Sequence, residues 1–198
     1  LAHEIKNPLT PIQLAAERMQ LKLHAKLAGD DAVALKRSTD TIISHVGAMK
    51  AMVDEFRDYA RLPAPKLASV DLNSVIAEVI TLYEPARHII QLKLGADLLR
   101  VAADASQMRQ VIHNLSQNAQ DAVGGRERPR IEVSTSQVEH GLRLTISDTG
   151  GGLPDGLIKR AFEPYVTTKP KGTGLGLAIV KNIIDEHHVR ISLNNWND

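Results

Sequence analysis

The sequence predicts an α+β fold in two parts, an N-terminal antiparallel helical hairpin followed by a mixed α/β domain. Three observations support this prediction. Two long apolar seams repeat every 3.5 residues or so, a proline-rich break follows residue 62, and helical and strand patterns mix in the rest of the chain. Because these later helices and antiparallel strands do not alternate regularly, we expect helices packed on one face of a mixed sheet.

The first part is expected to be two long helices. Residues 1–27 and a second segment ending near Leu62 both carry apolar residues at alternating spacings of four and three. Gly29-Asp30-Asp31 is predicted to be the turn between them. A lone hairpin buries little apolar surface, so we expect two copies to form a dimeric four-helix bundle. The seam residues are Ile5, Leu9, Ile12, Ala16, Met19 and Leu23, then Leu35, Thr39, Ile42, Val46, Met49, Val53, Phe56 and Ala60.

Prolines mark the boundary between the two parts. Pro63 and Pro65 cannot continue a helix and they stiffen the connection. We therefore assign residues 1–62 to the hairpin domain, 63–70 to a linker, and 71–198 to the second domain.

The second domain contains three expected helices and four expected strands. The strongest helix spans 105–123, where Asp104 is a good N-cap and an apolar stripe recurs at helical spacing. Strands 131–138 and 142–147 are expected to pair in an antiparallel hairpin through His140-Gly141. The other expected elements are helices 73–85 and 173–187 and strands 89–94 and 189–193.

Composition excludes several classes of function. The 198 residues are 43% hydrophobic but only 3% aromatic, so the core must be aliphatic. A net charge of +1, without a basic run carrying aromatics, argues against nucleic acid as a partner. The absence of cysteine excludes disulfides and thiolate metal sites, and no apolar stretch approaches the roughly 18 residues that a membrane helix needs.

His3 is the first candidate for chemistry. Neutral imidazole is a nucleophile near neutral pH, and Glu4 can hold the second ring nitrogen and favour the reactive tautomer. Asn7 lies one helical turn later, and Pro8 should bend the helix just beyond it. The alternative is a capped surface helix with an incidental histidine. Because a working residue rarely stands at a helix start without a preceding turn, we expect the sequence to be a fragment of a longer protein.

Three segments of the second domain are suited to a nucleotide. Asn114 and Asn118 lie on one helical stripe, where amide oxygens can complete the coordination of Mg²⁺. Asp148 follows a strand and can accept from an exocyclic amine, while Gly150 and Gly152 let a flat ligand approach the backbone. Each segment alone also fits a polar helix flank or a glycine-rich turn.

The third segment opens a helix with closely spaced glycines. Backbone donors at a helix N-terminus form an anion site, and nearby lysines can reach phosphate oxygens. The spacing does not match a Walker A loop or the dinucleotide fingerprint. The residues concerned are Lys169, Lys171, Gly172, Thr173, Gly174, Leu175 and Gly176.

The ordered set of these motifs resembles two-component sensor histidine kinases. His3-Glu4-x-x-Asn7-Pro8, Asn114-x-x-x-Asn118, Asp148-x-Gly150-x-Gly152, Phe162-Glu163-Pro164-Tyr165 and Gly172-x-Gly174-x-Gly176 look like the H, N, G1, F and G2 boxes of that family. The resemblance covers nearly the whole chain. The extended match from His3 to Leu14 looks most like the nitrogen-regulation sensors within the family.

The resemblance implies a dimerisation and histidine-phosphotransfer hairpin followed by a Bergerat-type α/β sandwich that binds ATP and Mg²⁺. It makes His3 the phosphoacceptor, Glu4 its base partner, and Asn7 a residue of the reverse reaction. Asn118 becomes the main Mg²⁺ ligand, with Asn114 less certain, and Asp148 reads adenine. Gly150 and Gly152 shape the floor of the site.

Other implied contacts involve the remaining motif residues. Residues 153–171 become the ATP lid, and Asp121, Lys169, Lys171, Thr173, Leu175 and the G2 glycines complete the nucleotide-binding set. The implied partners are a second copy of the chain and a response regulator, in the cytoplasmic portion of an inner-membrane sensor. The alternative is a nucleotide-sensing docking module, or a fragment that acts mainly as a phosphatase.

Two departures from the family pattern affect these expectations. Related ATP-hydrolysing proteins carry glutamate where Asn114 stands, and an amide cannot act as a general base, which favours transfer over hydrolysis. A further glycine pair is usual near His187-His188-Val189, followed by a closing strand. The second domain is therefore expected to lack its last strand in this sequence.

Overall fold

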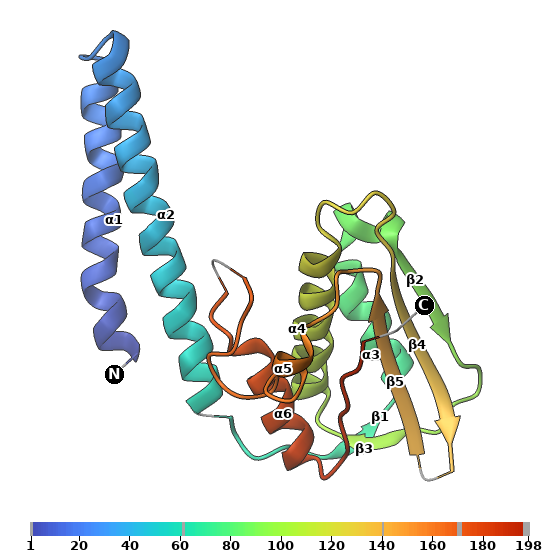
Figure 1. Ribbon diagram of the computed structural model, residues 1–198. Coiled ribbons are helices and arrows are strands. Elements are labelled where there is room, and N and C mark those ends of the chain that lie inside the picture. The colour runs from blue at the N-terminus through green and yellow to red at the C-terminus, as the bar shows by residue number, and fades with distance from the viewer. Residues whose placement is uncertain (1, 61, 140, 170–171, 196–198) are drawn as a thin grey trace. The chain divides into compact units, whose positions relative to one another are not determined.

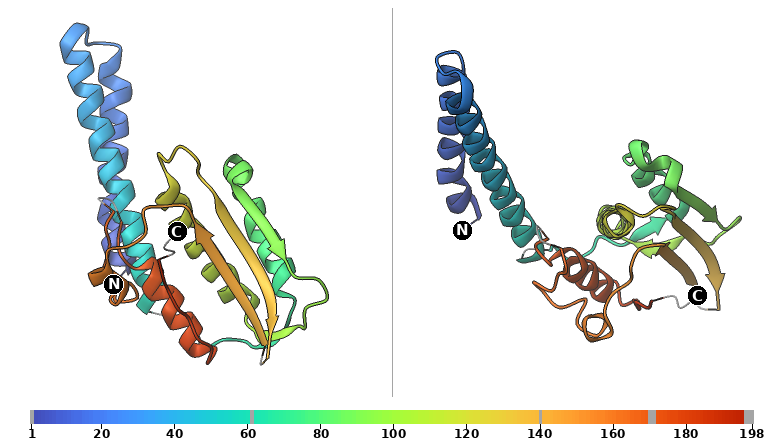
Figure 2. Two further views of the ribbon diagram at one scale, coloured as in Figure 1. Left: turned by 45° about the vertical axis from the view of Figure 1, so that its right-hand side comes forward. Right: turned by 45° about the horizontal axis from the view of Figure 1, so that its top comes forward.

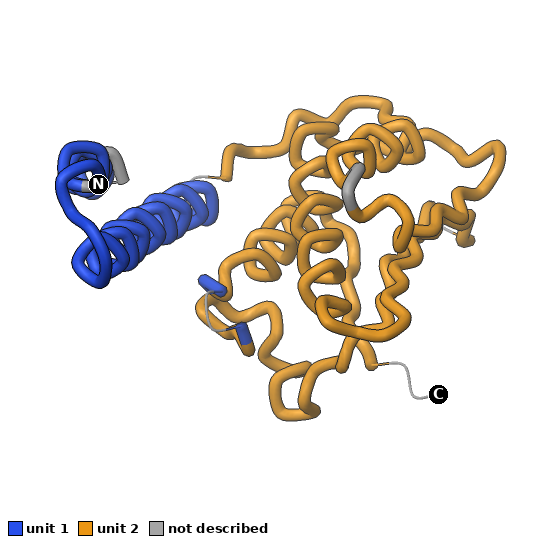
Figure 3. The backbone as a smooth tube through the Cα atoms, turned by 90° about the horizontal axis from the view of Figure 1, so that it is seen from above, with its two compact units in different colours: residues 1–61, 169–173 blue, residues 62–168, 174–198 orange. Residues whose placement is uncertain are grey.

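The computed structural model describes residues 2–60, 62–139, 141–169 and 172–195; the side chains of Ala2, His3, His24, Glu84 and Pro85 are outside this description. The chain separates into two compact units, each considered by itself. One contains Leu1–Arg61 with Lys169–Thr173, and the other contains Leu62–Thr168 with Gly174–Asp198 (Figure 3). The exact limits 1–62, 63–70 and 71–198 remain a prediction.

The first unit is a hairpin of two long helices, as the seam predicted (Figure 1). Helix α1 spans Ala2–His24 and continues through Pro8 and Pro11, while α2 spans Gly29–Ala60. The prediction that Gly29-Asp30-Asp31 forms the turn was wrong, because the connection lies at residues 25–28. Asp30 and Asp31 instead occupy the first turn of α2, where carboxylates interact favourably with the helix dipole.

Only alternate seam residues are buried between α1 and α2. Leu9 and Ala16 on α1 are 8% and 1% exposed, and Thr39 and Val46 on α2 are equally enclosed. Most of the intervening seam positions remain exposed in the single chain, while Leu35 is half-buried. They recur every seven residues, as Ile5, Ile12 and Met19 on α1 and as Ile42, Met49 and Phe56 on α2. The hairpin therefore has an inner seam that is packed and an outer seam that is not.

The second unit is a mixed sheet with helices on one face, as predicted (Figures 1 and 2). Strand β2 pairs parallel to β4, and β4 pairs antiparallel to β5, with Ile131 opposite Asp148. Short β1 and β3 form a separate antiparallel pair. The elements are β1 Ala68–Val70, α3 Leu72–Thr81, η1 Glu84–Ile89, β2 Ile90–Leu94, β3 Val101–Ala103, α4 Ala105–Val123, β4 Ile131–Val138, β5 Gly141–Asp148, α5 Asp155–Ile158 and α6 Gly176–Glu186.

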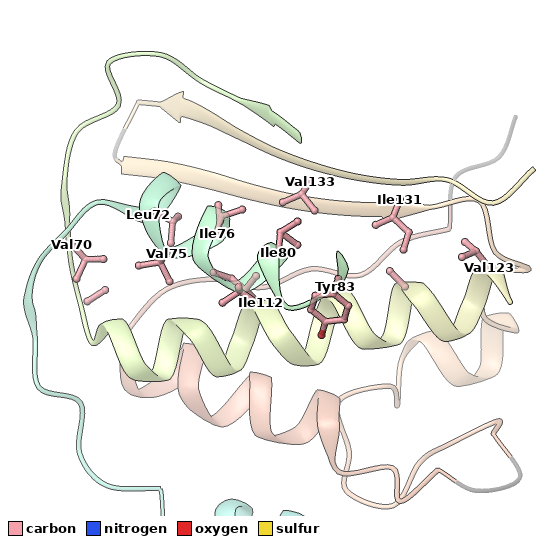
Figure 4. Packing of buried hydrophobic residues seen from close by; sticks show 13 residues of the cluster. Val70, Leu72, Val75, Ile76, Ile80, Tyr83, Ile112, Val123, Ile131 and Val133 are labelled. Atoms are coloured by element: carbon pink, nitrogen blue, oxygen red, sulfur yellow. The ribbon is translucent and has the colours of Figure 1, made fainter. Parts of the chain in front are cut away.

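Helix α4 is enclosed from two sides. Its Ile112, Ala119 and Val123 pack with α3 and with β4 in one aliphatic cluster, shown in Figure 4. Helix α6 lies on the side of α4 away from the sheet (Figures 2 and 4) and buries Ile179 and Ile183. Ala122, which continues the apolar stripe of residues 105–123 in the sequence, is instead exposed at the end of α4.

Several predicted bounds differ from the structure. Part of segment 63–70, which was expected to be a linker, forms β1. The sequence did not predict this strand because three residues are too few to show a strand period. Helix 73–85 ends at Thr81 and passes into the 3₁₀ helix η1, which contains Pro85. Helix 173–187 begins only at Gly176, because Gly174 has a left-handed φ of +70°.

The predicted strand 189–193 is absent from the described chain, where this segment is extended but unpaired. Ile191 and Leu193 are half-buried and alternate with exposed Arg190 and Ser192, which explains why the sequence resembles a strand. An alternating pattern shows which side is buried but does not supply a ladder partner.

The N-cap of α4, Asp104, can be tested directly. Its Oδ1 accepts from the backbone N–H groups of Ser106 and Gln107, and its Oδ2 accepts from Lys66 N at 2.8 Å. We expect Asp104→Ala to lower the free energy of unfolding by about 1 kcal/mol near neutral pH, as measured by urea denaturation. Exposed Glu127→Ala is the matched control and should be neutral.

The pH dependence of this loss has a definite sign. The Lys66 N–H, followed by the Gln107 and Ser106 N–H groups, lowers the pKa of Asp104 below its usual 3.8. The carboxylate therefore contributes stability above that value, and the contribution disappears as the pH falls through the lower, folded-state pKa. The difference between parent and variant should shrink with acidification; a difference that stays constant would contradict the capping role.

Candidate functional site

The two predicted amides lie on α4, and a contact between Tyr83 and His113 supports the turn that carries one of them. Asn114 and Asn118 are each half-buried on the same helical stripe. Next to Asn114, the Tyr83 hydroxyl lies 2.8 Å from His113 Nδ1 and donates to His113 O at 3.0 Å. This contact ties the turn between α3 and η1 to the middle of α4 and fixes the turn that carries Asn114.

The side-chain amide of Asn114 has a buried donor that is not satisfied within the described chain. Its Nδ2 atom is buried and, among the described residues, has no hydrogen-bond partner. A buried amide without a partner costs free energy, so its presence in this position favours a ligand. The O and N atoms of an amide are exchangeable by rotation, so Asn114 can offer an oxygen to a cation at the same point.

The loop after β5 is pressed against the end of α4. Asp148 is exposed, and its Oδ1 accepts from Gly150 N at 2.8 Å. A Cβ atom on Gly150 would lie 2.7 Å from Ala122 Cβ and 2.9 Å from Ala122 O, so only glycine fits there. Among the described residues only Oδ1 of Asp148 accepts a hydrogen bond, so Oδ2 can accept from a ligand, while Gly150 holds the loop close to α4.

The start of α6 lies against the same stripe of α4. A Cβ atom on Gly176 would lie 3.9 Å from Asn118 Nδ2. Leu175, directly before α6, is fully buried and fixes this turn in the core. The structure therefore brings together Asn118, the first turn of α6 and, one turn further along α4, the loop of Gly150.

The end of the predicted lid is closed by a backbone contact. Tyr165 N donates to Gly174 O at 3.0 Å, and Tyr165 itself has a left-handed φ of 66°. A Cβ atom on Gly174 would lie 2.5 Å from Tyr165 C. Between these ends, Gly172 N donates to Lys169 O at 3.1 Å, and Thr173 is half-buried. Lys171 lies outside the described residues, so its predicted role is untested.

The N-terminal motif lies on α1. Glu4 and Asn7 have exposed side chains one turn apart, and the side chain of His3 is outside the description. Between them, Lys6 forms an ion pair with Asp54 of α2. Hydrogen bonding from Lys6 is the main cause that lowers the pKa of Asp54. The pair fixes this end of α1 to α2 within the hairpin.

Asp121 faces a different neighbourhood from Asn118. It accepts from Gln117 Nε2 at 3.1 Å on the exposed side of α4. Burial raises the pKa of Tyr83 to about 12, and the charge of Asp121 adds to this shift. A role for Asp121 in ligand binding remains a prediction.

Two hollows lie away from these residues. One, of about 360 Å³, lies between α3 and α4 beside Glu78, Leu82 and Arg109, and the other, of about 400 Å³, lies beside His88 and Arg128. The described lining of neither hollow includes Asn114, Asn118 or Gly176. We base the site on its convergent polar groups instead, because a ligand held by open loops needs no deep cavity.

Both the hairpin and the α/β domain match known protein families. Residues 1–65 match the His Kinase A (phospho-acceptor) domain, and residues 103–196 match the Histidine kinase-, DNA gyrase B-, and HSP90-like ATPase family. The catalytic domain of the histidine kinase ThkA is 35% identical, with 61% of this chain and 81% of that chain covered and a TM-score of 0.54. The chain belongs to the sensor histidine kinase family.

Two longer relatives cover nearly all of this kinase chain. Nitrogen regulation protein NtrY of Azorhizobium caulinodans is 40% identical over 98% of this chain and 26% of its own length. Full-length ShkA in complex with AMPPNP has a TM-score of 0.70 at 27% identity, covering 94% of this chain and 40% of that chain. The chain thus spans about a quarter of the NtrY relative and two fifths of ShkA.

A third structure contains two proteins. Histidine kinase ThkA in complex with response regulator protein TrrA has a TM-score of 0.66 at 30% identity, covering 95% of this chain and 53% of that chain. Together these comparisons confirm the predicted family and the predicted architecture of a helical hairpin followed by an α/β domain. They do not test the individual site residues.

The donor set suits a nucleotide with Mg²⁺ better than a metal held by protein alone. Among the described residues, no three His, Cys, Asp or Glu side chains cluster as metal ligands. The convergent groups are instead the amides of α4, one carboxylate and glycines without room for side chains. Mg²⁺ bound mainly by phosphates and water requires only such additional oxygens.

No described helix has the length and apolarity needed to cross a membrane.

Three further residues shape this site although the sequence did not point to them. Ala122 forms the wall against Gly150, Arg126 lies 2.5 Å from where a Cβ of Gly151 would be, and Asn195 contacts Gly152. Ala122 and Arg126 are near the motif in sequence but have no distinctive chemistry. Asn195 is 42 residues from its hydrogen-bond partner Leu153, so no local pattern can reveal it.

The left-handed glycine before α6 allows a matched test. Gly174→Ala should destabilise the second unit by roughly 1–3 kcal/mol, because the new methyl group meets Tyr165 backbone at a strained φ. Gly156→Ala in α5 is the control, since a Cβ there has nothing within 4 Å. Thermal melting of both variants checks this; an equal effect of the two changes would contradict the close approach.

Proposed function

We propose that this chain is the catalytic portion of a protein-histidine kinase, which transfers the γ-phosphoryl group of ATP to His3. The observation that supports this best is the convergence of three motifs far apart in sequence, with Gly150 against Ala122 and Gly176 beside Asn118. Phosphoryl transfer needs mainly positioning and charge neutralisation, which amides, glycines and a helix N-terminus can supply.

In this proposal the part of the chain that follows the hairpin in sequence binds ATP. Asp148 accepts from the adenine amine, while Gly150 and Gly152 lie under the base. The backbone at Gly172, Gly174 and Gly176 binds the phosphates near the start of α6, assisted by Lys169 and Lys171. Asn118, with Asn114, would hold Mg²⁺ together with the phosphates and water, and the ion would neutralise charge on the phosphates.

His3 receives the phosphoryl group. Its neutral imidazole attacks phosphorus, the bond to the ADP leaving group breaks, and Glu4 holds the other ring nitrogen. Asn114 stands where a hydrolytic enzyme needs a base, and an amide there cannot activate water. The phosphoryl group then passes to an aspartate of a response regulator, in keeping with the ThkA and TrrA complex.

The working unit is a homodimer formed through the hairpin. The outer seam of α1 and α2 exposes apolar side chains at seven-residue spacing, including Ile12 at 47% and Met49 at 53%. Such a periodic apolar stripe fits a second copy in a four-helix bundle. By its likeness to NtrY, we assign the chain to the cytoplasmic portion of an inner-membrane sensor.

A second candidate function uses the same residues, but phosphatase activity outweighs kinase activity. Asn7 is exposed one turn from Glu4 on α1, where it can orient water towards a phosphorylated aspartate of the regulator. The chain would then act mainly as a phosphatase, or as a nucleotide-sensing docking module. Nucleotide binding without formation of phosphohistidine would favour this candidate.

Labelling with γ-³²P-ATP and Mg²⁺ separates the two. The parent chain should acquire an acid-labile, base-stable label, and His3→Gln should lose it completely because the proposed phosphoacceptor is removed. His45→Gln, at an exposed position on α2, is the matched control and should label like the parent. Equal labelling of the parent and His3→Gln would contradict the proposal.

The dimer interface is tested by charge substitutions on the outer seam. Ile12→Glu and Met49→Glu should weaken association at least tenfold, because a carboxylate would be buried in an apolar seam. Leu21→Glu is the control, since Leu21 is 79% exposed but lies off the seam. Sedimentation equilibrium gives the dissociation constants; a stronger effect at Leu21 would contradict this interface.

A further inference from the structure

Asn195 contacts the backbone beside the glycine-rich loop. Its Oδ1 accepts from Leu153 N at 2.9 Å, and its Nδ2 donates to Leu153 O at 2.7 Å. A side-chain amide thus pairs with both backbone groups of one residue, as a neighbouring strand would. This is the contact that replaces strand pairing for the segment after α6.

The same amide lies close to Gly152. A Cβ atom on Gly152 would lie 2.7 Å from Asn195 Oδ1 and 3.0 Å from its Cγ. Gly152 also has a left-handed φ of +65°, so two independent constraints require glycine there. The loop is therefore held at its start by Asp148, which accepts from Gly150 N, and at its end by Asn195.

We propose that Asn195 is a positioning residue for the nucleotide site, which holds Gly152 and Leu153 in the shape that binds the adenine end of the nucleotide. Asn195 does not itself touch the reacting atoms. It follows α6 in the chain, so one continuous segment carries both the phosphate-binding turn at Gly176 and the support of the adenine loop. This inference rests on the proposed nucleotide function.

Only a carboxamide can make both hydrogen bonds. Aspartate keeps the size and the acceptor but replaces the donor with an oxygen that repels Leu153 O, and alanine removes both partners. The contacts are exposed, so their loss should loosen the loop without unfolding the unit. The expected effect is a rise in KM for ATP with little change in kcat, because the reacting phosphate lies at the other end of the nucleotide.

The test compares Asn195→Ala and Asn195→Asp with Asn194→Ala, a neighbouring exposed amide, in the whole chain. We expect both Asn195 variants to bind fluorescent mant-ADP with Mg²⁺ about fivefold more weakly, with an unchanged melting temperature. Hydrogen exchange of the Leu153 amide should be faster in both. Asn194→Ala should match the parent in each measurement.

The possible outcomes separate this inference from the proposed function. A parent chain that does not bind mant-ADP would overturn both. Normal binding by the parent with equally tight binding by both Asn195 variants would overturn only the role of Asn195. Faster exchange at Leu153 with unchanged nucleotide affinity would also overturn it, because the contact would then be purely structural.

Discussion

The close packing of α4 against its surroundings is the constraint on which the rest of the second unit depends. One face of α4 belongs to the aliphatic core with α3 and the sheet, and another is covered by α6. Its remaining stripe carries Asn114 and Asn118 and ends at Ala122, where Gly150 approaches too closely for a side chain. Because the helix cannot rotate without exposing its core residues, the amides are held in one orientation.

Glycines at this site are needed for close packing between chain segments as well as for their backbone conformation. Gly150 and Gly152 are each within 3 Å of neighbouring atoms at the position where a Cβ would stand. Such contacts turn chain segments far apart in sequence into one surface lined by backbone groups. A surface of this kind can follow a planar base and a chain of phosphates, which suits nucleotide binding without a deep cavity.

The parts that sequence predicted well are those specified by local chemistry. Helix 105–123 matches α4 because Asp104 caps it and its apolar stripe is continuous. Hairpin 131–147 matches β4 and β5 because apolar and polar residues alternate in the sequence of these segments. The errors occur where tertiary contacts decide. Segment 189–193 alternates like a strand, yet the pairing that follows it comes from the side chain of Asn195. Helix α6 starts late because Gly174 must pair with Tyr165, which nothing nearby in sequence indicates.

The central claim is that the three motif segments form one adenine nucleotide site. Titration of the isotope-labelled chain with ATP and Mg²⁺, followed by amide NMR, tests it most directly. The account predicts saturable shifts at Gly150, Gly174 and Gly176 together, with one dissociation constant, and a weaker response in Asn118→Ala. Shifts at none of these glycines, or saturation at a distant surface only, would contradict it.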